Sequence, residues 1–239
     1  MTPARRVVFF DVAGTLLRVR GSVGAQYAAL ARRFGVDASP AVLDRLFPAA
    51  FRAAPPMTFP GALPEAIPAR ERAWWRGVVS GVFEAAGLLG AFGDAGFQAF
   101  FAALYAHFET AEAWQVYADV LPLLATLRAR GCRAGIITNF DGRVVPLLRH
   151  LGLADRFDSV TLSSRVGAAK PDPAIFRHAL ARHGVRADEA LHVGDSPAED
   201  VAGAAAAGLF AVLVDREGRH ADPARGVRVA SLTEVTRFL

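Results

Sequence analysis

Three polar residues in this sequence each stand at the end of a short apolar run. Asp11 follows VVFF, Thr138 ends RAGIIT and Asp195 follows ALHVG. If these runs are strands of an open parallel sheet, their carboxyl ends border one crevice, where such sheets bind ligands. A polar residue at a strand end can also simply cap the next helix, and for Thr138 alone that alternative stays open.

Lys170 adds a cation to this set. It is the only lysine among the 27 basic residues of the chain. A surface lysine before a Pro-x-Pro turn would be the ordinary interpretation. However, a chain that otherwise uses arginine has kept here the compact ammonium charge that a planar guanidinium does not reproduce. We therefore count Lys170 among the candidate functional residues.

From residue 119 onward, helical and strand patterns alternate. Helices are predicted over 119–131, with Asp119 at the N-cap, and over 142–152, 172–184, 196–208 and 231–239; strands are predicted over 133–138, 157–163, 190–194 and 209–215. Ser196 and Glu199 have the spacing of a capping box. Strands that alternate with helices of this length predict an α/β fold with a doubly wound, Rossmann-like parallel sheet.

The region between the first strand and residue 116 has a different pattern. Its apolar residues fall at helical spacing, and a proline-rich linker at 54–68 divides it. We expect a helical cap at 18–115, inserted into a catalytic core formed by 1–17 and 116–239.

Composition narrows the class of protein. The chain has 239 residues, 53% of them hydrophobic and 21% charged, which is enough for a core with an inserted subdomain. The net charge is +4, but the arginines are dispersed, so we expect no nucleic-acid partner. Cys132 is the only cysteine, which excludes an intrachain disulfide and fits the cytoplasm.

Two apolar stretches resemble targeting or membrane segments. Arg5 and Arg6 precede VVFF as in an export signal, but Asp11 interrupts that run. Charged and polar residues also break the stretch 82–108, which lacks the ~20 uninterrupted apolar residues of a membrane span. We expect a core strand and buried helices, with no membrane partner.

Four segments in order, FFDVAGTLL, IITNF, GAAKPDPAIF and HVGDSPAEDVAGAAAAG, resemble the four motifs of the haloacid dehalogenase-like hydrolase superfamily. The resemblance extends along the whole chain and includes the spacing between motifs. The insertion after the first motif is similar to the α-helical cap found in that position in the family.

The resemblance implies a set of catalytic and substrate-binding residues. Asp11 would be the nucleophile, forming an aspartyl-phosphate so that one difficult displacement becomes two easier ones. Thr138 and Asn139 would bond the phosphoryl oxygens. Lys170 would neutralise charge on the nucleophile and the phosphoryl group together. Phosphoryl transfer depends mainly on such positioning and charge compensation.

The resemblance also implies a Mg²⁺ site. Asp11 and Asp195 would hold the ion, with the backbone carbonyl of Ala13, and Asp200 would orient this shell from one step back. Family phosphatases commonly carry a second aspartate where this chain has Ala13, as general acid and base. Its loss removes a contribution of typically ~10² to 10⁴ in rate.

Three interpretations of Ala13 remain open. The first, which we favour, is a phosphatase for small phosphorylated substrates whose leaving group needs little protonation, such as acyl or aryl phosphates, or whose own groups supply the proton. The second is other family chemistry. Phosphonoacetaldehyde hydrolases need a cap lysine that this chain lacks, and haloacid dehalogenases lack the metal-site aspartate that Asp195 supplies here. The third is a slow or inactive protein that binds a phosphorylated ligand or a partner.

Residues of the insertion are weaker candidates for substrate contacts. Trp74, Trp75 and Arg76 are candidates to line a lid over the site, but aromatic pairs at helical spacing more often belong to a core. His107 lies among phenylalanines and fits a packing role. Asp141 and Arg143, after the second motif, fit caps of the following helix.

Overall fold

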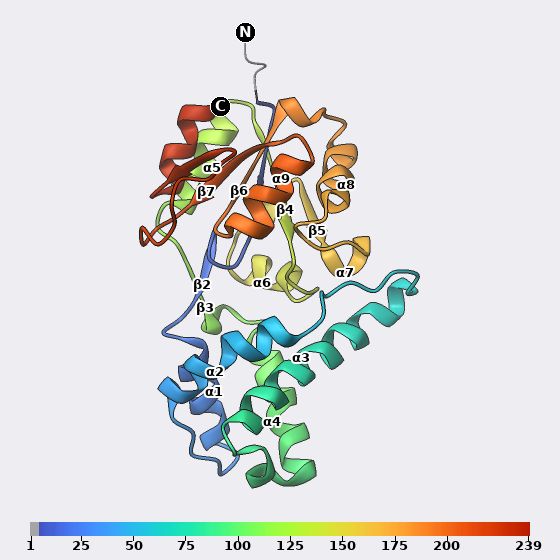
Figure 1. Ribbon diagram of the computed structural model, residues 1–239, viewed down its shortest axis with the longest axis vertical. Helices are drawn as coiled ribbons and strands as arrows, with labels where there is room; N and C mark the ends of the chain where they lie inside the picture. The colour runs from blue at the N-terminus through green and yellow to red at the C-terminus, as the bar shows by residue number, and fades with distance from the viewer. Residues whose placement is uncertain (1–4) are drawn as a thin grey trace. The chain divides into compact units, whose positions relative to one another are not determined.

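Four consecutive apolar residues, Val7–Phe10, form the central strand β1 of a six-stranded parallel sheet (Figure 1). The structure is a computed structural model that describes residues 5–239. The strand order is β5-β4-β1-β6-β7-β8. The other strands are β4 (Arg133–Thr138), β5 (Ser159–Leu162), β6 (Ala190–Gly194), β7 (Phe210–Val214) and β8 (Val227–Val229).

Helices cover both faces of this sheet. Val7 and Phe9 pack with Phe176 of α8 on one face, and strand alternation turns Val8 and Phe10 to the other. All four side chains of β1 are fully buried, as in a strand covered on both sides. The flanking helices are α5 (Val120–Ala129), α6 (Val144–His150), α7 (Ser163–Val166), α8 (Pro173–His183) and α9 (Gly203–Ala206). The predicted doubly wound fold is confirmed.

The chain path creates a crevice at the carboxyl end of β1. From β1 the sheet extends through β4 to β5 on one side and through β6 and β7 to β8 on the other. Strand order therefore reverses at β1, the position where open α/β sheets bind ligands. Asp11, Thr138 and Asp195 stand at the carboxyl ends of β1, β4 and β6.

The chain divides into two units. The core unit comprises Met1–Arg18, Thr58–Gly61 and Val116–Leu239, and the helical unit comprises Val19–Met57 and Ala62–Gln115. These boundaries differ from the predicted ones in assigning Arg18 and the tetrapeptide Thr58–Gly61 to the core unit. A separate two-stranded sheet pairs β2 (Leu17–Val19) with β3 (Trp114–Val116).

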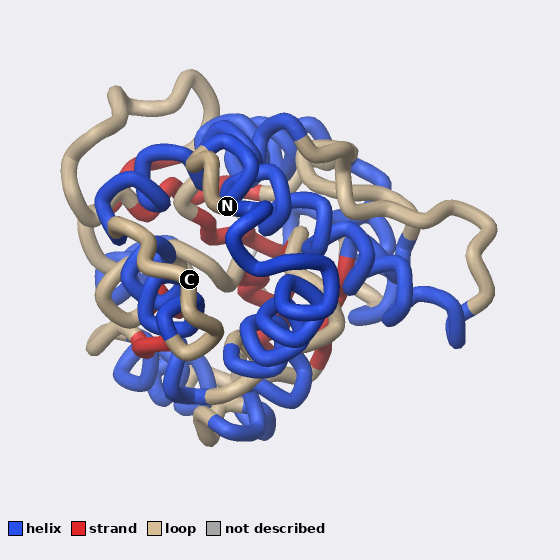
Figure 2. The backbone as a smooth tube through the Cα atoms, turned by 90° about the horizontal axis from the view of Figure 1, so that it is seen from below, coloured by secondary structure: helices blue, strands red, loops and turns tan. Residues whose placement is uncertain are grey.

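The helical unit has an aromatic core. Its helices are α1 (Val23–Arg32), α2 (Pro40–Ala53), α3 (Ile67–Ala85) and α4 (Gly93–His107), and helices make up most of the regular structure of the chain (Figure 2). The ring of Phe100 stacks on Phe92 at 4.6 Å and meets Phe83 edge-on at 5.1 Å. No single helix within residues 5–239 meets the length and apolarity of a membrane span, although the bent pair Pro64–Ala85 and Leu89–His107 meets both together.

The segment after β6 differs from the predicted helix over 196–208. Pro197–Ala202 form a π-helical turn, and only Gly203–Ala206 are α-helical. The Ser196 side chain accepts a hydrogen bond from the Glu199 amide, as predicted, but the Glu199 carboxylate bonds Asn139 and does not complete a capping box. Such wide turns are frequent at functional sites, and this one carries Asp200.

Asp119 occupies the predicted N-cap position of α5 but does not cap the helix with its side chain. Helix α5 begins at Val120, but the Asp119 side chain makes no capping bond. Its carboxylate accepts instead from Arg216 and from the Leu232 amide. Asp119 therefore ties the start of α5 to the C-terminal part of the core unit, a long-range contact that a local cap pattern cannot reveal.

Candidate active site

The strand ends bring the predicted polar residues together. The Thr138 hydroxyl donates to Oδ1 of Asp11 over 2.9 Å, and the Asp11 amide donates to the carbonyl of Val193 on the neighbouring strand. Carboxylate oxygens of Asp11, Asp195 and Asp200 all lie within 4.8 Å of one another. One site thus unites residues separated by almost 190 positions.

Lys170 enters this site from the loop between α7 and α8. Its Nζ lies 2.6 Å from Oδ1 of Asp11 and 2.6 Å from Oδ1 of Asp200. The lysine is only 4% exposed. One ammonium group therefore bridges two carboxylates out of contact with bulk water, which requires a small, point-like charge.

Asn139 holds the main chain of Lys170. Its Oδ1 accepts from the Lys170 amide at 2.9 Å, and its Nδ2 donates to the Lys170 carbonyl at 3.0 Å. Nδ2 also donates to Glu199. The side-chain amide thus positions the loop of Lys170, while the predicted contact between Asn139 and a phosphoryl group stays a prediction.

Asp200 is fixed by donors on each of its oxygens. Oδ1 accepts from Lys170 and, at 2.8 Å, from Nε2 of His192, while Oδ2 accepts from the Ser196 amide at 3.0 Å. A Cβ on Gly194 would stand 2.0 Å from Cγ of Asp200, so only glycine leaves room for the carboxylate over β6. Asp200 is 1% exposed.

His192 is the site residue that the sequence analysis missed. It stands in the middle of the buried strand β6 and is 1% exposed. Burial lowers the pKa of His192, although its bond to Asp200 opposes the shift. The imidazole is therefore neutral near pH 7, with its hydrogen on Nε2. A histidine two positions before the glycine of an otherwise apolar strand was the available signal.

The cluster of Asp11, Asp195, Asp200 and Lys170 contains more carboxylates than cations. Burial raises the pKa of Asp195 to about 7, reinforced by the charges of Asp11 and Asp200. Burial also raises the pKa of Asp11, against the opposing effect of Lys170. Burial opposes the charges of Lys170 and Asp200. Nevertheless Asp11 and Asp200 hold the pKa of Lys170 above its usual value, and Lys170 holds the pKa of Asp200 below its usual value. One cation thus faces three carboxylates.

The same carboxylates fit a divalent metal ion. Hard ions such as Mg²⁺ prefer oxygen ligands, and the three side chains offer them within a small volume. Burial, together with the charges of Asp11 and Asp200, raises the pKa of Asp195, and a bound cation would offset both causes.

Ala13 is an exposed residue in the turn that follows Asp11. The turn is closed by bonds from the Leu16 amide to the Val12 carbonyl and from the Gly14 amide to the Leu17 carbonyl. Gly14 has a φ of +86°, and a Cβ there would stand 2.2 Å from Oδ2 of Asp195. The turn therefore runs close to the carboxylate cluster, but the Ala13 methyl group can neither give nor take a proton.

Asp141 and Arg143 lie just beyond Thr138 and form a buried ion pair. Arg143 donates from Nε and Nη2 to the two oxygens of Asp141, at 2.8 and 2.7 Å. Its amide also donates to Oδ1 of Asp141. The N-cap residue of α6 is Arg143, and no side chain makes a capping bond there. Asp141 instead holds the amide and the guanidinium of Arg143 just before the helix begins.

The residues of the helical unit that were weaker candidates for substrate contacts have partners within that unit. The ring nitrogen of Trp74 donates to the Pro55 carbonyl, and Trp74 packs edge-on against Trp75. Nε2 of His107 bonds Gln26. These contacts fit the packing interpretation.

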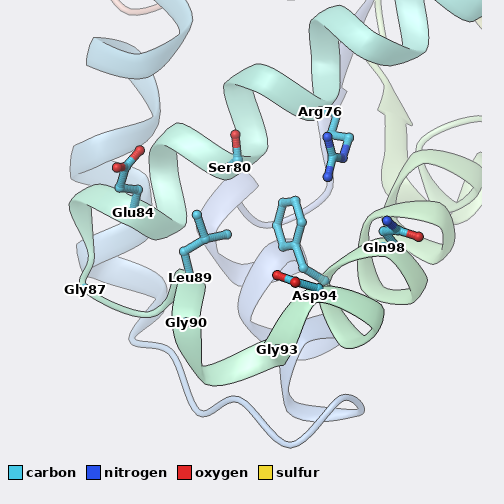
Figure 3. A pocket seen from close by; sticks show the side chains of 10 residues that line it. Arg76, Ser80, Glu84, Gly87, Leu89, Gly90, Gly93, Asp94 and Gln98 are labelled. Carbon is cyan, nitrogen blue, oxygen red and sulfur yellow. The ribbon is translucent and has the colours of Figure 1, made fainter.

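Arg76 borders a surface pocket of about 770 Å³ in the helical unit (Figure 3). Ser80 and Glu84 of α3 and Asp94 and Gln98 of α4 also line it. The guanidinium lies over the ring of Phe97, 5.8 Å from its centre. Its predicted role as a substrate contact stays a prediction.

Comparison with known proteins identifies the family. Residues 5–208 match the family model described as haloacid dehalogenase-like hydrolase. The chain is 37% identical over 213 residues to haloacid dehalogenase-like hydrolase domain-containing protein 3 of Mus musculus, covering 87% of this chain and 81% of the mouse protein. The chain therefore belongs to the haloacid dehalogenase-like hydrolase family, as its four motifs predicted.

Two further relatives carry enzymatic names. A phosphoserine phosphatase of Thermus thermophilus is 41% identical over 137 residues, which is 54% of this chain and 53% of that protein. The crystal structure of a 2-haloacid dehalogenase from Pseudomonas syringae pv. Tomato superposes with a TM-score of 0.65 at 27% identity, covering 98% of this chain and 97% of the other. The family resemblance therefore includes both phosphatases and dehalogenases.

Proposed function

We propose that this protein is a Mg²⁺-dependent phosphohydrolase that acts on a small phosphorylated molecule through Asp11. The observation that carries the proposal is the single ammonium group of Lys170, which lies 2.6 Å from both Asp11 and Asp200 beside a third carboxylate, Asp195. A nucleophile, a fixed cation and a set of hard oxygen ligands are what phosphoryl transfer requires of a protein.

Asp11 would attack with its second oxygen. Thr138 and Lys170 both donate to Oδ1, and no hydrogen bond from residues 5–239 reaches Oδ2. Oδ2 would form a bond to phosphorus as the bond from phosphorus to the leaving oxygen breaks. Water would then attack phosphorus, releasing inorganic phosphate and restoring the carboxylate.

The neighbouring residues would support both steps by position and charge. Lys170 would offset charge on Asp11 and on the transferring group, and Asn139 would hold the loop that carries it. Asp11, Asp195 and the Ala13 carbonyl would hold Mg²⁺, with Asp200 behind them. When bound, the ion would withdraw charge from the phosphoryl oxygens.

Ala13 defines the class of substrate that such a site would favour. Without an acid at position 13, the leaving oxygen departs with little protonation, which aryl and acyl phosphates tolerate better than alkyl phosphates. The phosphoserine phosphatase relative supports phosphate-ester chemistry in general. Phosphoserine is an alkyl phosphate, but that relative matches only 54% of this chain.

Dehalogenation is the second candidate. The 27% identity to a 2-haloacid dehalogenase over nearly the whole chain favours it. In that reaction Oδ2 of Asp11 would attack carbon and displace halide. Asp195 and Asp200 count against it, because a metal-free reaction with a neutral or monoanionic substrate has no use for three clustered carboxylates.

A rapid-mixing assay with p-nitrophenyl phosphate tests the proposal. Phosphate release is measured with Mg²⁺ and with chelator, with Asp11→Asn as the blank. Mg²⁺-dependent release that disappears in the blank supports the phosphohydrolase, and a burst followed by slow turnover assigns the cost of Ala13 to dephosphorylation. Absence of release together with halide release from a 2-haloacid would overturn the proposal, and absence of both would favour a binding role.

A further inference from the structure

We propose that His192 is a positioning residue that sets the place of Lys170 by holding Asp200. A chain of two hydrogen bonds joins them: His192 Nε2 to Asp200 Oδ1 at 2.8 Å, and Lys170 Nζ to the same oxygen at 2.6 Å. Lys170 then reaches Asp11 at 2.6 Å. His192 touches none of the reacting groups and acts only through Asp200.

The strand β6 is built to receive this carboxylate. His192 and Gly194 are two positions apart, so the His192 side chain and the side-chain position left empty by Gly194 face the same side of the sheet. Gly194 leaves the space that the Asp200 carboxylate occupies, and His192 supplies a donor beside it. The space above Gly194 and the hydrogen-bond donor of His192 lie on the same face of β6, and together they accommodate the Asp200 carboxylate.

Packing alone gives little reason for a histidine here. The ring lies edge-on to Phe176 at 5.1 Å, a contact that an apolar side chain would make as well. Its Nδ1 is buried and has no hydrogen-bond partner in the part of the chain that the structure describes. An unsatisfied buried nitrogen is unfavourable, so the bond to Asp200 is what this histidine adds over leucine.

The donor restricts the movement of Asp200 and therefore of Lys170. With His192 present, Oδ1 lies at the meeting point of two donors while the Ser196 amide holds Oδ2. Without it, the carboxylate can turn about its side-chain bonds, and the ammonium group follows. Second-layer contacts of this kind typically change metal affinity or activity by about 10- to 100-fold.

His183 provides a matched control in the same unit. It is also a buried histidine, with a hydrogen bond to Ser159 and an edge-on contact with Phe9 at 5.1 Å, but it bonds none of the carboxylates of the site. Replacement of His183 by leucine removes comparable packing and one hydrogen bond. It separates loss of stability from loss of positioning.

The test compares His192→Leu, His192→Gln and His183→Leu in the full chain. Glutamine keeps an N–H donor near the position of Nε2, whereas leucine keeps only the volume. With p-nitrophenyl phosphate and Mg²⁺, we expect His192→Leu to lower kcat by about 10- to 100-fold with little change in KM. Glutamine should restore most of the activity, and His183→Leu should lower the melting temperature while kcat is retained.

The positioning role of His192 rests on the proposed function only for its expected effect on kcat. A second measurement therefore follows the surroundings of Lys170 directly and needs no turnover. The chain has one lysine, so labelling lysine with ¹⁵N gives a single Nζ resonance, that of Lys170. We expect this resonance to move in His192→Leu, to return toward its original position in His192→Gln and to stay unchanged in His183→Leu.

The outcomes separate the two proposals. An unchanged Nζ resonance in a folded His192→Leu variant would overturn the positioning role, as would equal defects in the leucine and glutamine variants. If the unmodified protein releases no phosphate but the resonance moves as expected, the proposed function fails and the positioning of Lys170 by His192 stands.

Discussion

Lys170 and Arg143 are both buried cations of the core unit, but they meet carboxylates in different ways. Arg143 directs two nitrogens of its planar fork at the two oxygens of one residue, Asp141, at 2.8 and 2.7 Å. Lys170 directs one nitrogen at two residues, Asp11 and Asp200, both at 2.6 Å. The first geometry fits a guanidinium and the second fits an ammonium group.

The two clusters also differ in charge balance. In the Arg143 pair one cation meets one carboxylate, which satisfies both partners and fixes the turn after β4. In the Lys170 cluster one cation serves Asp11 and Asp200 while Asp195 lies within 4.8 Å. A balanced pair stabilises local structure, whereas an unbalanced one retains the capacity to bind a further cation. For this reason we assign the candidate active site to the Lys170 cluster and not to the Arg143 pair.

Exchange of the two cations is expected to have the largest effect. Lys170→Arg should lower kcat/KM for p-nitrophenyl phosphate by about 10²- to 10³-fold, because the larger fork cannot occupy the point between two carboxylates. Arg143→Lys should instead lower the free energy of unfolding by about 2 kcal/mol through loss of one charged hydrogen bond, with little change in kcat. Steady-state kinetics and denaturant unfolding of both variants measure the contrast.

Retention of activity in Lys170→Arg would show that charge alone matters at that position. A large loss of kcat in Arg143→Lys would mean that the Asp141 pair controls the loop of Thr138 and Asn139 closely enough to affect the reaction. In either case the distinction between a stabilising pair and a reactive cluster would have to be redrawn.

Much of this arrangement could be predicted from the sequence, because strand and helix patterns depend on residues that are close together along the chain. Strand and helix periods located Asp11, Thr138 and Asp195 at strand ends, and the unique lysine drew attention to Lys170. Contacts between distant segments were not accessible in this way. The bond of Asp119 to Arg216 and the use of Asn139 as a clamp on the Lys170 loop depend on which segments the fold brings together.

His192 shows the same limit within a strand. Its position in ALHVG indicates only a buried side chain, and a buried polar residue must find a partner. The partner, Asp200, comes from the π-helical turn that replaces the start of the predicted helix over 196–208. A regular helical pattern predicts neither that turn nor the direction in which it points Asp200.

Ala13→Asp is expected to have the next largest effect, since it adds the acid that the site lacks. Hydrolysis of an alkyl phosphate should rise by up to about 10²-fold, and that of p-nitrophenyl phosphate much less, because only the alkyl leaving group needs strong protonation. Parallel kcat/KM measurements on the two substrates with Mg²⁺ give the ratio, with Ala13→Asn as the control that cannot transfer a proton. Equal gains on both substrates, or the same gain with asparagine, would contradict the general-acid explanation.

The last expected effect is on the pH dependence of stability in the presence of chelator. The pKa of Asp195 is raised from 3.8 to about 7 in the folded chain, so the folded state binds a proton that the unfolded state has released between these values. The contribution of Asp195 to the free energy of unfolding should therefore fall as pH rises from about 4 to about 7, with a slope of at most about 1.4 kcal/mol per pH unit. Asp11 and Glu199, whose pKa values are also raised, act in the same direction. His192 and His183, whose pKa values are lowered by burial, act in the opposite direction below about pH 6.5.

Asp195→Asn should reduce this slope, whereas Asp155→Asn, at an exposed position of the core unit, should leave it unchanged. Mg²⁺ should oppose the fall in the unmodified protein, because the ion binds the carboxylate form and stabilises the folded chain at the higher pH. Denaturant unfolding at several pH values, with chelator and with Mg²⁺, measures both effects. A slope that neither Asp195→Asn nor Mg²⁺ alters would mean that the charge imbalance around Lys170 is relieved by some group other than Asp195, and the contrast with the Arg143 pair would then rest on geometry alone.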